Sequence, residues 1–121
     1  MPQALSTTTL YLARRDAYAA FLTAADAESH AAHHRHEGRY PDAREAVDAI
    51  DRAYAATRAA FNVIDVEAAG PVKEGRVVLE RLRELDRGDG GQRDWYAYKK
   101  AREDFLAAAG AHLRELLAAA G

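Results

Sequence analysis

The sequence of 121 residues predicts an all-α protein, an antiparallel up-down four-helix bundle with a short third helix. Three observations support this fold class. Apolar and small residues recur three and four positions apart, which places them on one side of an α-helix. Gly38, Pro41 and the pair Gly70-Pro71 interrupt this pattern where helices would end or begin. No segment alternates apolar and polar residues as a strand does, and short connections favour antiparallel helices.

The first helix is expected at about residues 8–37, between hydroxyl residues that can cap its start and Gly38, which can end it. Its inward side should carry a mixed set of aromatic, small and polar residues. These are Tyr11, Arg15, Tyr18, Leu22, Ala25, Ser29, Ala32 and His36, with Phe21 beside them.

The second helix, expected at residues 41–69, has the clearest apolar pattern, and we expect the other helices to lie against it. Pro41 suits a first helical turn, where no backbone donor is needed. The helix would be about 40 Å long at 1.5 Å per residue. Its inward side should carry Ala43, Val47, Ile50, Tyr54, Thr57, Phe61, Ile64 and Ala68.

The remaining helices are expected at residues 72–87 and 92–119, so that residues 1–121 form a single domain. Gly75 interrupts the third helix at a cost of about 1 kcal/mol relative to alanine. Apolar residues of the third helix share one side: Val72, Val78, Leu79, Leu82 and Leu85. The inward side of the fourth helix should carry Trp95, Tyr98, Ala101, Phe105, Ala108, His112 and Leu116.

Because the third helix is short, part of the first two helices is expected to lack a cover near residues 30–50. Small residues are frequent there: Ala25, Ala31, Ala32, Ala43, Ala46 and Ala49. Either these helices pack closely as an arm, or Trp95 and Tyr98 cover them, or a second subunit does. Bare apolar seams usually find a partner, so a homodimer is expected.

Composition restricts the class of partner. Seventeen lysine and arginine residues against 19 acidic residues give a net charge of -2, which predicts neither nucleic acid nor an anionic membrane as a partner. No apolar run approaches the roughly 20 residues of a membrane span. There is no cysteine, which excludes disulfides and thiolate chemistry. We expect a cytoplasmic protein.

A histidine cluster near the end of the first helix is a candidate site for a divalent transition metal, the one cofactor that the sequence suggests. His30 and His34 are four residues apart, so their imidazoles lie on adjacent turns, and Asp26 or Glu37 can add an oxygen ligand. The alternative is a solvated helix end at which histidine is tolerated.

Polar residues within the apolar patterns form a second candidate, a layer of arginine and tyrosine between helices. Such a layer can hold an anionic ligand, because guanidinium groups match carboxylate and phosphate. The alternative is a hydrogen-bonded layer that sets the helix register. The candidate ligand-binding residues are Arg15, Tyr18, Tyr54, Tyr98, Arg102 and His112.

No catalytic motif is present: there is no Glu-x-x-His pair, His-Glu-x-x-His, Gly-x-Ser-x-Gly or phosphate-binding glycine loop. We therefore expect a non-enzymatic protein that acts through self-association and an unidentified protein partner. The alternatives are a metal-binding protein that uses the histidine cluster, and a small-ligand sensor or minor enzyme that uses the arginine and tyrosine layer.

Three segments, residues 14–22, 69–72 and 104–109, carry a resemblance. Their sequences are Arg-Arg-Asp-Ala-Tyr-Ala-Ala-Phe-Leu, Ala-Gly-Pro-Val and Asp-Phe-Leu-Ala-Ala-Ala. In these the chain resembles small alanine-rich helical proteins of high-GC bacteria. The resemblance implies the helical fold and a bacterial cytoplasmic setting, and it carries no site residues.

Overall fold

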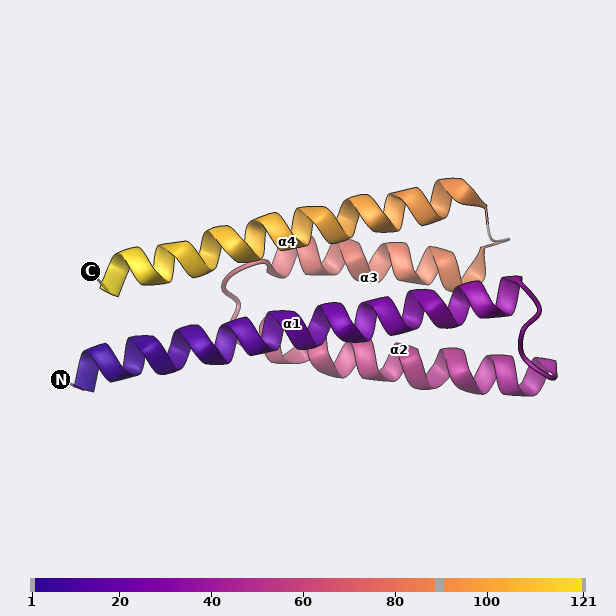
Figure 1. The fold of residues 1–121 in the computed structure, drawn as a ribbon, viewed down its shortest axis with the longest axis horizontal. Helices are drawn as coiled ribbons and strands as arrows, with labels where there is room; N and C mark the ends of the chain where they lie inside the picture. Colours follow the sequence, from indigo (N-terminus) through magenta and orange to yellow (C-terminus); the bar gives the residue numbers. More distant parts are fainter. Residues whose placement is uncertain (1, 89–90, 121) are drawn as a thin grey trace.

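The computed structural model describes residues 2–88 and 91–120, and these form four α-helices and no strand. Successive helices run in opposite directions, and the first and last described residues lie at the same end of the molecule (Figure 1). The predicted four-helix bundle with a short third helix is confirmed. The helices are α1 (Pro2–His36), α2 (Ala43–Asp65), α3 (Val72–Arg87) and α4 (Gln92–Ala120).

The helix around which the bundle is arranged is α1, not α2 as the sequence suggested. α1 is the longest helix and packs against α2, α3 and α4, whereas no described Cα atom of α2 lies within 8 Å of one of α4. α2 has a more regular apolar pattern than α1 because it buries one narrow side. α1 contacts three helices, so its contacts are spread around its circumference and its pattern is less regular.

α2 is shorter than predicted at both ends. Asp42 caps its start, since the Asp42 Oδ1 atom accepts a hydrogen bond from the Glu45 N–H at 2.8 Å. Pro41 therefore precedes the cap and does not lie in the first turn. The helix ends at Asp65, and Ala68 has a φ of 52°, a left-handed conformation that a right-handed helix does not continue through.

The buried side of α2 also differs from the predicted one near its start. Ala46 is buried, whereas Val47 is 52% exposed and Ala43 and Ala68 are exposed. The predicted residues Ile50, Thr57, Phe61 and Ile64 are buried as expected.

Aromatic rings from three helices meet at the centre of the core. The ring centroid of Phe21 on α1 lies 5.5 Å from that of Phe61 on α2 and 5.0 Å from that of Phe105 on α4. Gly75 of α3 lies against the same cluster, and a Cβ atom built there would be 2.5 Å from the Phe61 Cε1 atom. The glycine that appeared to weaken the third helix thus lets its backbone approach the Phe61 ring closely.

The alanine-rich region near residues 30–50 is covered from within the chain. The Trp95 ring on α4 lies 5.5 Å from the His33 ring, and Tyr98 is buried. Four of the six alanines named above are buried: Ala25, Ala31, Ala32 and Ala46. The structure thus combines the first two predicted arrangements, because α1 packs closely on α2 and Trp95 lies against α1. Ala46 in particular faces the core and is not available to a partner.

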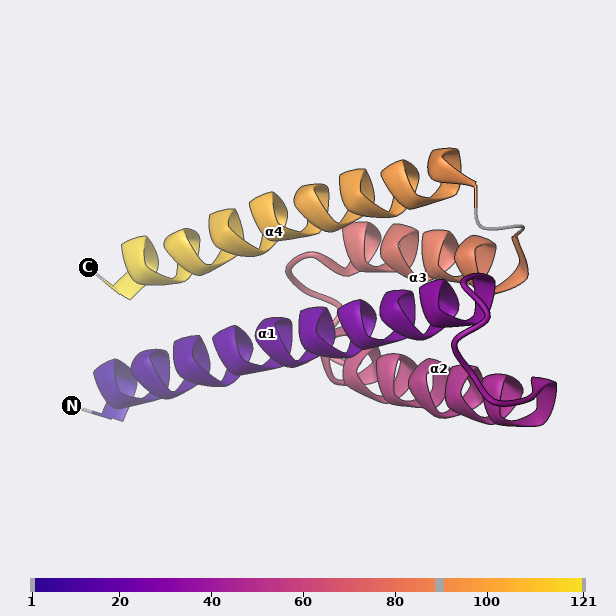
Figure 2. The same cartoon turned by 45° about the vertical axis from the view of Figure 1, so that its right-hand side comes forward.

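The long helices α1 and α4 project together beyond the ends of α2 and α3 on the side of the two termini (Figures 1 and 2). The uncovered part of the bundle therefore lies at the opposite end from the predicted one, because α1 begins at Pro2 and α2 ends at Asp65. Among the described residues, no helix combines the length and the apolarity needed to cross a membrane.

Candidate functional site

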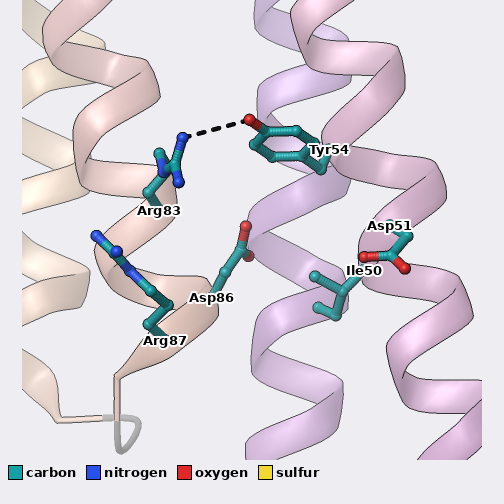
Figure 3. A pocket seen from close by; sticks show the side chains of 6 residues that line it. All are labelled: Ile50, Asp51, Tyr54, Arg83, Asp86 and Arg87. Carbon is teal, nitrogen blue, oxygen red and sulfur yellow. Dashed lines mark hydrogen bonds between the residues drawn. The ribbon is translucent and has the colours of Figure 1, made fainter.

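A hollow of about 290 Å³ lies between α2 and α3 (Figure 3). Its lining combines guanidinium, carboxyl, phenol and aliphatic groups, and such a mixture is typical of sites for small ligands. Within each helix the lining residues are one, three or four positions apart, so each helix presents one side to the hollow. They are Ile50, Asp51 and Tyr54 of α2 and Arg83, Asp86 and Arg87 of α3.

Two arginines hold Tyr54 in the wall of this hollow. The Arg83 Nη1 atom donates a hydrogen bond to the Tyr54 hydroxyl at 3.3 Å, drawn as a dashed line in Figure 3. The Arg83 guanidinium carbon lies 5.8 Å from the centroid of the Tyr54 ring, and that of Arg58 lies 5.0 Å from it. Each cation–π contact of this kind contributes about 0.5–1 kcal/mol at an exposed site.

A pair of carboxyl groups, Glu28 of α1 and Asp86 of α3, lies between the helices beside the hollow. Glu28 is only 1% exposed. Burial raises the pKa of Asp86, and a hydrogen bond to Glu28 and the Glu28 charge raise it further, to about 8, against the opposing charges of Arg35 and Arg83. Asp86 is therefore mainly protonated at neutral pH.

That proton accounts for two buried oxygen atoms that have no hydrogen-bond partner within the described residues, Glu28 Oε2 and Asp86 Oδ1. Two ionised carboxylates would only repel each other, whereas one shared proton lets one carboxyl group donate to the other. Protonated Asp86 can therefore donate a hydrogen bond to Glu28, which agrees with its raised pKa.

A second hollow of about 270 Å³ adjoins the first at Arg83 and contains more arginine. Arg76 forms an ion pair with Asp65 at 2.9 Å. The buried Nε atom of Arg58 has no hydrogen-bond partner within the described part of the chain. The side of the bundle formed by α2 and α3 therefore has an unsatisfied donor and several guanidinium groups along one groove.

Two of the six predicted ligand-binding residues, Tyr98 and Arg102 of α4, contact Asp26 of α1. The Asp26 Oδ1 atom accepts from the Tyr98 hydroxyl and from Arg102 Nε, both at 2.8 Å, and Oδ2 accepts from Arg102 Nη2 at 2.9 Å. Burial raises the pKa of Asp26, but the hydrogen bonds from Arg102 and Tyr98 and the Arg102 charge outweigh it, so that the pKa is lowered. This arrangement matches the alternative in which the polar residues form a hydrogen-bonded layer between helices.

Two further predicted residues, Tyr18 and His112, lie in a different layer near the projecting ends. Arg14 links this layer: its Nη1 atom lies 3.0 Å from His112 Nε2, and its Nη2 atom pairs with Glu67 at 2.8 Å. The Tyr18 and His112 rings meet edge-on at 6.3 Å. Gly70 packs against both rings, since an added Cβ would lie 2.5 Å from the Tyr18 hydroxyl. The layer joins α1 and α4 to the connection between α2 and α3.

The structure therefore distributes the six predicted residues over separate places. Tyr54 alone lines the hollow between α2 and α3. Arg15 is exposed, and its contact with neighbouring Asp16 is a loose surface pair at 3.4 Å. The predicted single layer is not formed. The inward polar residues lie at different positions along the bundle, and each pairs with a residue of the helix that is beside it at that position.

The histidine cluster is divided among four environments. His36 donates from Nε2 to the Leu85 carbonyl oxygen at 3.3 Å, which satisfies a carbonyl at the end of α3. His33 lies against Trp95, and His34 meets the Tyr40 ring edge-on at 6.0 Å. His30 is exposed.

The four proposed metal ligands do not form a group. Asp26 is engaged by Arg102 and Tyr98, and Glu37 pairs with Arg39 at 3.3 Å. Within residues 2–88 and 91–120, no three or more His, Cys, Asp and Glu side chains are placed to hold a metal ion. Metal binding by His30 and His34 alone stays a prediction.

Sequence reasoning missed Glu28, Arg83 and Asp86 as site residues. Glu28 offered a signal, because it is three residues after Ala25 and four before Ala32, on the same side of the helix. An acidic residue at such a position must be paired or protonated. Its partner Asp86 belongs to another helix, and no local pattern indicated which one.

No protein-family model matches the sequence, and the comparisons with curated proteins and with solved structures gave no match.

Proposed function

We propose that this protein is a non-enzymatic helical module that acts by self-association, through the ends of α1 and α4 that project beyond α2 and α3. The observation that carries this proposal is the scarcity of charge on these ends. Residues 6–13 of α1 include no charged side chain, and after His112 the sequence of α4 has two, Arg114 and Glu115, although Leu10 is 36% and Leu117 is 53% exposed. Helix surfaces that face only water normally carry charged and polar residues.

On α1, the apolar side that packs against α2 extends toward the N-terminus beyond the point where α2 ends. Ala17 packs against the core, and Leu10 and Ala13 are seven and four residues before it, so they lie on the same side of the helix. The ion pair between Arg14 and Glu67 lies at the end of α2. Beyond it, a shallow hollow on α1 is lined by Ser6, Thr9, Leu10 and Ala13. This hollow occupies the place that a longer α2 would cover.

A second copy fits this surface by symmetry. At the projecting ends only α1 and α4 are present, because α2 and α3 are too short to continue the four-helix bundle there. A copy related by a twofold axis would bring its own two projecting ends into that space, and each copy would complete the other. The net charge of -2 opposes such an association only weakly.

Light scattering coupled to size-exclusion chromatography tests the proposal. The wild-type protein is expected to have the mass of a dimer at tens of micromolar, and Leu10→Glu is expected to have the mass of a monomer with unchanged helical circular dichroism. Leu12→Glu is the matched control, because Leu12 is 41% exposed and lies on the opposite side of the same helix.

Two outcomes would contradict the proposal. One is a wild-type monomer at every concentration up to about 1 mM. The other is equal weakening of the dimer by Leu10→Glu and Leu12→Glu. A monomer whose Leu10 side binds a different protein would support the broader prediction of a protein partner and reject self-association.

The expected setting is the bacterial cytoplasm. The absence of cysteine supports it, because small domains of oxidising compartments often depend on disulfides.

A further inference from the structure

We propose that the hollow between α2 and α3 binds a small monocarboxylate with an aromatic or aliphatic body. This site lies on a different part of the molecule from the projecting ends of α1 and α4. The two proposals therefore succeed or fail separately.

The charge of the hollow favours a single negative charge on the ligand. Arg83 and Arg87 extend from α3 on one wall, and Asp51 lies on the α2 wall (Figure 3). With Asp86 protonated, the lining has two positive charges and one negative charge. A guanidinium group binds a carboxylate through two parallel hydrogen bonds, which gives strength and orientation.

The same lining disfavours two other classes of ligand. A metal cation would face two guanidinium groups. A phosphate dianion would carry one charge more than the net single positive charge of this lining, and it would lie beside the Asp51 carboxylate. A carboxylate satisfies the arginines at the lowest cost in repulsion.

The rest of the hollow suits an apolar body. Ile50 and the ring of Tyr54 form the α2 wall, and the ring is fixed by its contacts with Arg58 and Arg83. A volume of about 290 Å³ is at the lower end of the range for small-molecule sites. A single ring or a short branched chain fits this size.

The protonation of Asp86 controls the charge of the hollow that it lines. The groups that face Asp86 are Glu28 and Arg35 from α1, Asp51 and Tyr54 from α2, and Arg83 and Arg87 from α3. When Asp86 holds the proton that it donates to Glu28, it adds no negative charge beside a bound carboxylate, whereas ionised Asp86 repels that carboxylate. Carboxylate binding should therefore weaken as the pH rises from 7 to 9.

Titration followed by amide NMR tests the site, with benzoate as the probe and benzamide as its neutral match. Benzoate is expected to shift the amide signals around Tyr54, Arg83 and Asp86 and to saturate in the millimolar range or below at pH 6.5. Benzamide is expected to bind at least tenfold more weakly. Inorganic sulfate, a dianion at this pH, is expected to cause no saturable shift at these residues.

Variants on α3 identify the residues responsible. Arg83→Ala and Arg87→Ala are each expected to weaken benzoate binding at least tenfold. Arg81→Ala is the matched control, since Arg81 lies on the same helix, pairs with Glu84 and does not line the hollow. Because Arg83→Ala also removes a contact of Tyr54, Arg87→Ala is needed to separate loss of charge from movement of the ring.

Asp86→Asn retains a donor and removes the titration, so its benzoate affinity is expected to be the same at pH 7 and pH 9. The proposal is overturned if benzoate gives no saturable shift in the wild type, if benzamide binds equally well, or if the Arg87→Ala and Arg81→Ala variants bind benzoate alike.

Discussion

Asp26 and Asp86 are two carboxyl groups of the same type, each placed between helices, and their surroundings give them opposite ionisation behaviour. Asp26 accepts hydrogen bonds from Tyr98 and Arg102, so its pKa is lowered and it is ionised at neutral pH. Asp86 faces Glu28, and burial and that carboxyl group raise its pKa to about 8. The bundle thus contains one satisfied polar contact and one protonated acidic pair.

The difference separates a structural role from a candidate binding role. Every oxygen of Asp26 is engaged within the chain, so the Asp26 contact fixes α1 against α4 and offers nothing to a ligand. Asp86 lines a hollow and forms no ion pair within the described residues, and its carboxyl group faces that of Glu28. Perturbed acids that remain unsatisfied beside a hollow are candidates for ligand sites, whereas fully paired ones usually stabilise the fold.

The largest effect is expected from Asp26→Ala, which should lower the free energy of unfolding by about 2 kcal/mol. The substitution leaves the half-buried Arg102 guanidinium and the buried Tyr98 hydroxyl without their main acceptor. Urea unfolding at pH 7 measures the effect. A loss below about 0.5 kcal/mol would mean that the Asp26 contact is no stronger than a surface ion pair.

The next effect is a change in pH dependence with Asp86→Asn. Because the pKa of Asp86 is raised above its unfolded value of about 3.9, the folded chain binds the extra proton, and wild-type stability should fall as the pH rises from about 4 to about 8. Water screens a half-buried group, so we expect a difference on the order of 1 kcal/mol between pH 5 and pH 8 that Asp86→Asn removes.

Asp26→Asn is the control for this pH experiment. Because the pKa of Asp26 is lowered in the folded chain, ionised Asp26 stabilises the fold at any pH above the pKa of an ordinary aspartate. This contribution is lost only as the pH falls through the pKa that Asp26 has in the folded chain. The difference in stability between pH 5 and pH 8 should therefore be the same in Asp26→Asn as in the wild type. If Asp86→Asn also leaves it unchanged, Asp86 is not protonated at pH 5.

A smaller effect is expected from Tyr98→Phe, about 0.5–1 kcal/mol of destabilisation, because Asp26 keeps both hydrogen bonds from Arg102. The pKa of Asp26, followed by NMR of its side-chain carboxyl carbon, should rise as one of its donors is lost. An unchanged pKa would show that the Tyr98 hydroxyl does not stabilise the ionised form.

The smallest effect is expected from Arg15→Ala, within about 0.5 kcal/mol of the wild type in thermal or urea unfolding. Arg15 and Asp16 form an exposed ion pair at 3.4 Å, with 55% and 72% of their side chains accessible. A loss comparable to that of Asp26→Ala would mean that Arg15 has a partner in solution, such as a second copy.

Local pattern was sufficient for the helices themselves. The spacing of apolar residues is imposed by 3.6 residues per turn, and Gly38 and Gly70 have φ values of 68° and 76°, conformations that glycine adopts readily. The four segments and the short third helix therefore followed from the sequence. The ends of α2 were less well predicted, because Asp42 competes with Pro41 as the start and the left-handed Ala68 has no sequence signal.

Which residues form the candidate sites depends on how far each helix is displaced along its neighbours. The periodicity of residues within one helix does not determine this displacement. That displacement brings Arg102 to Asp26, and not to the acidic residues beside it in the sequence. It brings Glu28 to Asp86, and it leaves the projecting ends of α1 and α4 bare, whereas the alanine-rich end is covered. Which residues are helical and which sides are apolar can be predicted from the chain, because both follow from short-range geometry. Which polar groups meet depends on the packing of the whole core, because that packing selects partners on different helices.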